Sequence, residues 1–306
     1  MIVTRLLAAL SLAFVPLAAA QSEAPVRAPL VVTAEQDFIV PVEVNGRLLR
    51  LRLDPGTERI VLNPEAAAAA GLDGSMFGVA AMVGPVRVNG RTSLTRVAIG
   101  DWRERRRVMW FSRPVVSGAD GVIGMAMLPH PVSALRFREA TADDRTITIP
   151  VAEDGQFGLL YRHPVGGETI QVSFRLWQPL TQATASAGAH LAAHHGGTWS
   201  GEAMERPVLL GVERPVRPMQ FAAPLSFGGL RLDGLLVRTA DFRGAFVLPS
   251  DPSADPDEIV VTGNVRRGRA RLTVTIGNDV AGRCASVTYD RAAGTLTMVC
   301  PSAMSG

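Results

Sequence analysis

Asp54 has the residue type and the local setting that best fit a chemical role in this sequence. It follows a strand-like run at 47–53 and opens the tight turn Asp54-Pro55-Gly56-Thr57. A carboxyl group held on such a turn can remove a proton from water, and a second carboxyl group about 3 Å away would share a proton with it. Asp-Pro-Gly is also a common turn sequence without any chemical role, so the surrounding elements must decide.

Strand-like segments surround this turn on both sides. Asn45-Gly46 separates two runs with strand periodicity and predicts a two-residue hairpin. After the turn, residues 60–62 predict an apolar strand, and Asn63 caps a short alanine-rich helix that ends at Gly71. Many short strands with closely spaced turn signals predict a β barrel or sandwich.

This arrangement resembles the retropepsin-like and pepsin-like aspartic proteases. The resemblance rests on the hairpin, the Asp54 turn, the helix after it and the later segment 120–128, and it covers residues 30–140. In that family a later apolar-apolar-glycine segment passes behind the catalytic turn, so the resemblance implies that Ile123 and Gly124 support it. It also implies an all-β fold with two pepsin/retropepsin-like lobes, each a closed barrel with a short helix.

The resemblance implies roles for individual residues as well. Asp54 would be the catalytic carboxyl group that activates water, and Pro55, Gly56 and Thr57 would complete the active-site turn. The substrate would be a peptide or a protein.

Two features depart from the family's pattern. The family's Asp-Thr-Gly is Asp54-Pro55-Gly56 here, and proline has neither the hydroxyl group nor the N–H that could brace the turn. In the second half, where a second aspartate turn is expected, the chain reads from Leu176 to Gln182 without a carboxylate. A lone, exposed carboxyl group has a pKa of about 4 and gains little as a base.

Three hypotheses for Asp54 remain open. In the first, it pairs with Asp54 of a second chain in a homodimer, and the protein is an aspartic endopeptidase. In the second, the protein keeps the protease fold but binds peptides or a cell-envelope partner without cleaving them. In the third, Asp54 is an ordinary turn residue.

The second half of the chain loosely repeats the first. A strand at 169–176 and a helix at 186–196 follow the same order as the strand before Asp54 and the helix after it. We therefore expect a retropepsin-like lobe at 30–148 and a degenerate second lobe or accessory β domain at 160–301.

Residues 1–20 have the pattern of a cleavable signal peptide. Arg5 precedes an apolar run at 6–15, and small residues come before Gln21. The apolar run is short for a membrane span, so we expect no stable membrane anchor; an uncleaved anchor is the alternative. The pattern predicts a periplasmic or secreted protein.

The chain has two cysteines, Cys284 and Cys300. Export places them in an oxidising compartment, where such a pair normally forms a disulfide bond. Metal binding or redox chemistry would require closer spacing or additional ligands.

Other kinds of site find little support in the sequence. The basic residues are all arginine and form no continuous stripe, so we expect no nucleic-acid partner. His190, His194 and His195 invite a metal hypothesis, but Leu191 stands where a zinc peptidase motif requires glutamate, so we expect no metal site. Phosphate-binding loops and dinucleotide fingerprints are absent from the sequence, and we expect no cofactor.

Overall fold

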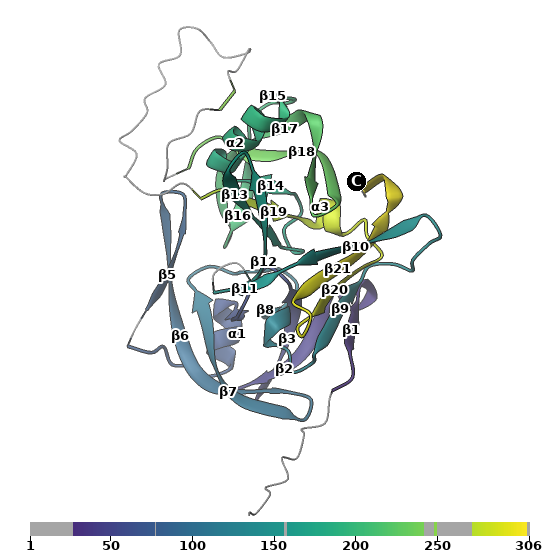
Figure 1. Cartoon of the computed structure of the whole chain (residues 1–306). Coiled ribbons are helices and arrows are strands. Elements are labelled where there is room, and N and C mark those ends of the chain that lie inside the picture. Colours follow the sequence, from purple (N-terminus) through teal and green to yellow (C-terminus); the bar gives the residue numbers. More distant parts are fainter. Residues whose placement is uncertain (1–26, 77, 156–157, 242–247, 250–270, 305–306) are drawn as a thin grey trace, which may run out of the picture.

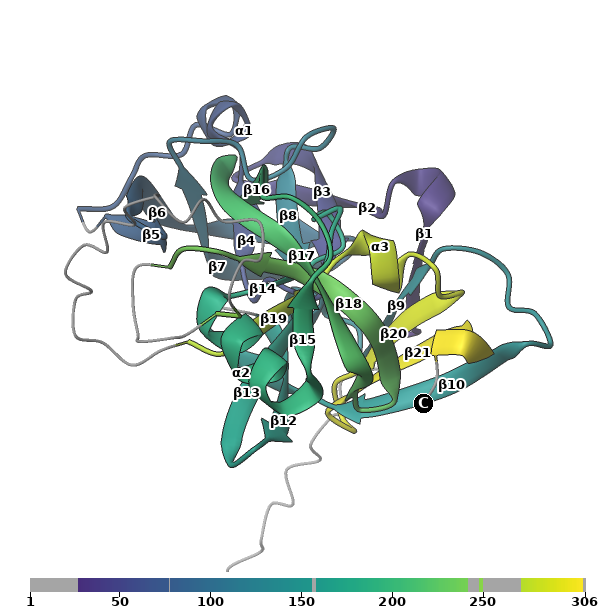
Figure 2. The ribbon, with the colours of Figure 1, turned by 90° about the horizontal axis from the view of Figure 1, so that it is seen from above.

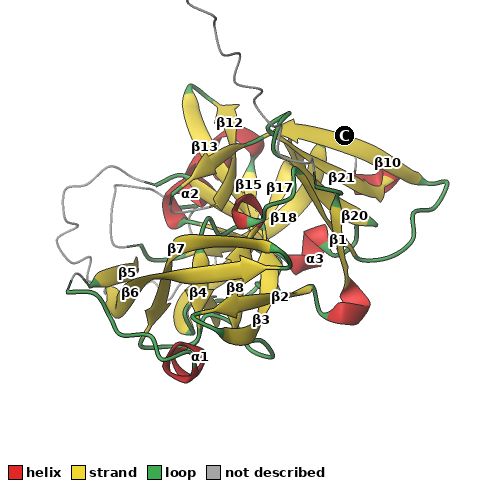
Figure 3. Cartoon of the chain, turned by 90° about the horizontal axis from the view of Figure 1, so that it is seen from below, coloured by secondary structure: helices red, strands yellow, loops and turns green. Residues whose placement is uncertain are grey.

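The computed structural model describes residues 27–76, 78–155, 158–241, 248–249 and 271–304. Strands make up most of it, and the few helices are short (Figure 3). The predicted all-β, two-lobed fold is confirmed. The proposed signal peptide at 1–20 lies outside the described residues. No helix among the described residues is both long and apolar enough to cross a membrane.

The first lobe is a closed barrel of six strands. In bonding order they are β2 (Ile39–Val44), β3 (Arg47–Asp54), β8 (Gly121–Gly124), β4 (Ile60–Leu62), β7 (Trp102–Phe111) and β6 (Val86–Ile99). Pairing of β2 with β6 closes the barrel. β5 (Val79–Val83) pairs with β6 outside the barrel, and the hairpin of these two strands extends toward the second lobe (Figure 1).

The local signals around the first lobe formed the predicted elements. Asn45 and Gly46 both have positive φ, as a two-residue hairpin turn requires. Helix α1 (Pro64–Ala69) begins after Asn63 and has proline at its start. The Asn63 side chain does not cap the helix but holds the loop before β8, where it contacts Val115, Val116 and Ala119.

The second lobe is an open sheet of nine strands. In bonding order they are β11 (Ala152–Asp154), β12 (Gly158–Val165), β13 (Glu168–Phe174), β19 (Thr273–Ile276), β14 (Gln182–Ala183), β18 (Leu230–Arg238), β17 (Val212–Phe227) and β15 (Gly197–Trp199), with β16 (Met204–Leu209) on β17. Helix α2 (Ala185–His195) follows β14, and α3 (Asn278–Ala281) follows β19.

The two lobes share one topology. The order β12-β13-β19-β14-β18-β17 repeats β2-β3-β8-β4-β7-β6, with parallel and antiparallel pairings at the same steps. α2 follows β14 as α1 follows β4. Among the described residues, β12 does not pair with β17, so this sheet stays open where the first lobe closes. The weak repeat in the sequence therefore corresponds to a repeated chain path.

A third sheet connects the lobes. Its strands, in order, are β1 (Leu30–Thr33), β9 (Val132–Arg136), β20 (Ser286–Asp290), β21 (Thr295–Pro301) and β10 (Asp144–Pro150). The C-terminal hairpin β20–β21 thus lies between β9 and β10, which follow the first lobe in the chain. It is on the side of the molecule away from the β5–β6 hairpin (Figure 2). The remaining helices are single 3-10 turns at Ala34–Gln36, Met125–Met127 and Ser302–Met304.

The predicted disulfide bond between Cys284 and Cys300 is confirmed. Both cysteines are fully buried. Cys284 lies two residues before the first strand of the C-terminal hairpin, and Cys300 lies in its second strand.

Candidate functional site

Asp54 is the last residue of β3, and β8 lies directly beside it. In the parallel pairing of these strands, Asp54 stands opposite Gly124, and Leu53 stands opposite Ile123. A side chain at Gly124 would collide with the carbonyl oxygen of Thr57, so only glycine lets the turn lie this close to the strand. The structure therefore brings the predicted support residues and the predicted turn together.

The Asp54 carboxyl group is buried between the lobes. Its side chain is only 1% exposed. Oδ1 accepts a hydrogen bond of 3.0 Å from the backbone N–H of Leu176, which belongs to the second lobe. Oδ2 is buried and has no hydrogen-bond partner among the described residues. A buried carboxyl oxygen without a donor is costly, and such atoms occur preferentially where a ligand or water completes the site.

The Asp54 turn rests against the second lobe through its backbone. A side chain at Gly56 would collide with the carbonyl oxygen of Phe174. The carbonyl oxygen of Pro55 accepts a hydrogen bond of 2.8 Å from the N–H of Leu159. The brace that a threonine hydroxyl would supply is therefore replaced by backbone contacts to the second lobe.

Burial raises the pKa of Asp54 to about 6. The Arg175 guanidinium acts in the opposite direction, as do the N–H groups of Leu176 and Gly56 and the Trp177 side chain, but burial outweighs them. The value of about 4 expected for a lone, exposed carboxyl group does not apply to Asp54, because Asp54 is buried.

Arg175 occupies the position in the second lobe that corresponds to Asp54 in the first. Phe174 stands opposite Ile276 in the pairing of β13 with β19. Arg175 follows Phe174, and its backbone N–H donates a hydrogen bond to the carbonyl oxygen of Ile276. In the first lobe Leu53 stands opposite Ile123 in the same way, and Asp54 follows it. The position where a dyad would have its second carboxylate is thus occupied by an arginine in this chain.

Arg175 was not among the predicted site residues, because the second turn was expected one position later, from Leu176 onward. The signal lies in Thr275-Ile276-Gly277, which repeats the apolar-glycine pattern of Val122-Ile123-Gly124. Aligning these two segments identifies 275–277 as the counterpart of 122–124, and the pairing of β13 with β19 then leads to Arg175.

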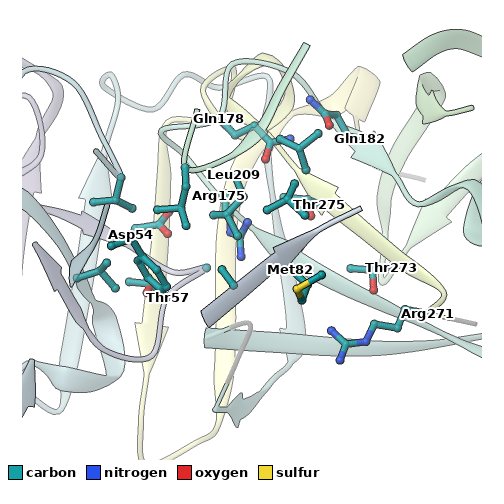
Figure 4. Close-up of a pocket in the computed structure, with 18 of the residues that line it drawn as sticks. Asp54, Thr57, Met82, Arg175, Gln178, Gln182, Leu209, Arg271, Thr273 and Thr275 are labelled. Atoms are coloured by element: carbon teal, nitrogen blue, oxygen red, sulfur yellow. The ribbon is translucent and has the colours of Figure 1, made fainter. Parts of the chain in front are cut away.

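A cavity of about 640 Å³ lies between the lobes, and Asp54 is in its wall (Figure 4). The first lobe contributes the Asp54 turn and the β5 strand, including Met82. The second lobe contributes Arg175, polar side chains such as Gln182 and Thr275, and the tip of the β16–β17 hairpin. Residues from both halves of the chain therefore face one space.

Two hairpins cover this cavity. Val83 on the β5–β6 hairpin and Leu210 on the β16–β17 hairpin belong to one buried apolar cluster that also contains Val61 and Val122. These hairpins occupy the same place in the repeated topology, after the helix of each lobe. A ligand in the cavity would therefore be enclosed by both lobes and both hairpins.

The histidines lie away from this cavity. His190 donates a hydrogen bond to the carbonyl oxygen of Val165, and its ring lies 4.5 Å from that of His194. Among the described residues, no group of three metal-binding side chains comes together.

Comparison with known proteins points to the first lobe. A family model described as aspartyl protease matches residues 40–127, from the first hairpin to the segment behind the Asp54 turn. No curated protein matches the chain significantly. The match supports an aspartic protease family and a protease-like function.

Proposed function

We propose that this protein binds extended peptide segments in the cleft between its lobes, as an aspartic protease does, without cleaving them by itself. The observation that carries the proposal is the Asp54 carboxyl group. It is buried in the wall of a cavity that both lobes line, and its Oδ2 has no hydrogen-bond partner in the part of the chain that the structure describes. Such an oxygen can accept a hydrogen bond from a peptide N–H group.

Cleavage by a proton-sharing pair requires a second carboxyl group beside the first. Arg175 takes that position here, and Leu176 already donates to Asp54 Oδ1. A guanidinium cannot be deprotonated in a protein and cannot act as the second acid. We therefore propose binding, and not hydrolysis, as the activity of the single chain.

Peptide hydrolysis is the second candidate function, and the pKa of about 6 favours it. A carboxyl group with that pKa is a stronger base than an ordinary aspartate, and a nearby guanidinium stabilises a developing oxyanion. A homodimer could supply the missing acid, but Asp54 of a second chain would have to displace Leu176 and the residues before it. The inter-chain pair is the less favourable route.

We also propose that the protein is exported to the periplasm or beyond. The signal-like pattern of residues 1–20 supports this, and so does the disulfide bond between Cys284 and Cys300. Cell fractionation would contradict it by finding the protein, at its full length, in the cytoplasm.

The test measures binding and cleavage side by side. Fluorescein-labelled peptides from an unfolded protein are titrated with wild type, Asp54→Asn and the control Glu43→Gln, whose side chain lies on the exposed face of β2. Cleavage of the same unfolded protein is followed between about pH 3 and pH 6. We expect binding by wild type and control, weaker binding by Asp54→Asn, and the same low cleavage for all three.

Two outcomes would change the conclusion. Cleavage by wild type that disappears in Asp54→Asn would establish the second candidate, and a monomeric mass by light scattering would then exclude the inter-chain pair. Absence of both binding and cleavage would overturn both candidates.

A further inference from the structure

We propose that Arg175 makes the second-lobe wall of the cleft a subsite for a carboxylate, either an acidic side chain of the bound peptide or its C-terminal group. This inference rests on the proposed peptide binding and names the class of peptide. It assigns to Arg175 a role in recognition that the second carboxyl group of a protease could not have.

Among the described residues, the Arg175 guanidinium has no ion-pair or hydrogen-bond partner. It lines the cavity and is partly buried, but no carboxylate of the described residues lies within ion-pair distance and it donates no hydrogen bond to them. Burial lowers the pKa of Arg175, and the opposite effect of the Asp54 charge offsets only part of this decrease. A desolvated cation without an acceptor is costly unless a ligand completes it.

The charges on the second-lobe wall around Arg175 also favour an anion. Arg238 and Asp241 line the same cavity and form an ion pair of 3.2 Å with little solvent exposure, so their charges compensate each other. The positive charge of Arg175 remains, which favours an anionic group over a neutral peptide carbonyl.

The geometry around Arg175 also suits a carboxylate. Its guanidinium carbon lies 5.9 Å from the centre of the Trp177 ring, which positions the group over an aromatic face. The planar fork of arginine matches a carboxylate in a bidentate arrangement.

The test compares four versions of one short fluorescein-labelled alanine–leucine peptide. They carry either glutamate or glutamine in the middle and end in either a free carboxylate or an amide. Binding of each to the wild-type protein is measured by fluorescence anisotropy. We expect loss of the recognised carboxylate to weaken binding by about tenfold to a hundredfold, the usual range for a charge-assisted hydrogen bond.

The arms of this comparison identify the source of the carboxylate. Weaker binding on replacing glutamate by glutamine indicates an acidic side chain, and weaker binding on amidation indicates the peptide C-terminus. Equal binding of all four peptides would overturn the subsite but leave the proposed peptide binding in place. Failure of every peptide to bind would overturn both.

Variants of the protein connect the preference to Arg175. Arg175→Gln should remove the difference between the four peptides, and Arg175→Lys should keep part of it because the charge remains. Arg96→Gln on the exposed face of β6 is the control and should keep the wild-type preference. Circular dichroism checks that each variant is folded, and a carboxylate preference that persists in folded Arg175→Gln would overturn the assignment.

Discussion

At the scale of single residues, the chemistry of this protein depends on how deeply Asp54 is buried. A carboxyl group that is 1% exposed cannot be treated as an ordinary turn residue. Two N–H groups of the backbone and the Arg175 guanidinium favour its charged form, yet desolvation outweighs them and raises its pKa to about 6. Such a group changes its charge near pH 6.

The pKa of Asp54 predicts a dependence of stability on pH. Its value of about 6 in the folded protein lies above the ordinary value of 3.8, so between these values the folded state binds the proton more tightly than the unfolded chain. The free energy of unfolding must therefore decrease as the pH rises through this window, by about 3 kcal/mol from this group. Above the window the loss is complete.

Urea unfolding of wild type and Asp54→Asn at pH 4 and pH 7 checks this prediction. We expect the variant to lack the decrease, so that its stability relative to wild type rises between the two pH values by up to about 3 kcal/mol. Glu43→Gln serves as the control and should follow wild type. A constant difference between wild type and Asp54→Asn across this range would show that the carboxyl group is not buried as described.

At the scale of elements, the site depends on two strand pairs that meet at their ends. β3 with β8 positions Asp54, and β13 with β19 positions Arg175. The two turns touch where Gly56 lies against the carbonyl oxygen of Phe174. The contact between lobes is thus made by backbone atoms, which leaves little freedom for a side chain at this position.

Gly56→Ala should therefore separate the Asp54 turn from the second lobe. We expect the free energy of unfolding to fall by about 3 kcal/mol, because the new methyl group must displace backbone and not a flexible side chain. Chemical denaturation measures the effect. The matched control is Gly78→Ala, whose methyl group would lie 3.4 Å from the carbonyl oxygen of Gly90, so that an equal loss in both variants would contradict the prediction.

At the scale of the whole molecule, the sheet between the lobes sets their arrangement. It combines β1 and β9 from the first half of the chain with the C-terminal hairpin β20–β21, and β10 forms its other edge. The disulfide bond lies at this hairpin, across a sequence separation of 16 residues. Covalent closure of such a loop reduces the entropy of the unfolded chain.

Removal of the disulfide bond in the double variant Cys284→Ala/Cys300→Ala should lower the free energy of unfolding by about 3 kcal/mol. Thermal unfolding of the variant and of wild type, with and without a reducing agent, measures this. We expect reduced wild type to resemble the variant. An unchanged melting temperature after reduction, with free thiols confirmed by titration, would contradict the role assigned to the bond.

The sequence by itself determined the features that depend on near neighbours. Asn45-Gly46 specified a hairpin because both residues tolerate positive φ, and Asn63-Pro64 specified the start of a helix. The pattern at Ile123-Gly124 located the strand behind the Asp54 turn, and two cysteines allowed a single pairing within the chain.

Only the tertiary structure decided what faces Asp54. The burial that raises its pKa comes from Phe174 to Leu176, more than a hundred positions later in the chain. The place of Arg175 follows from the pairing of β13 with β19, which are distant in sequence as well. Contacts of this kind depend on which strands pair. Propensity and periodicity describe only neighbours along the chain, so these two signals could not reveal that an arginine stands in the position of the second carboxyl group.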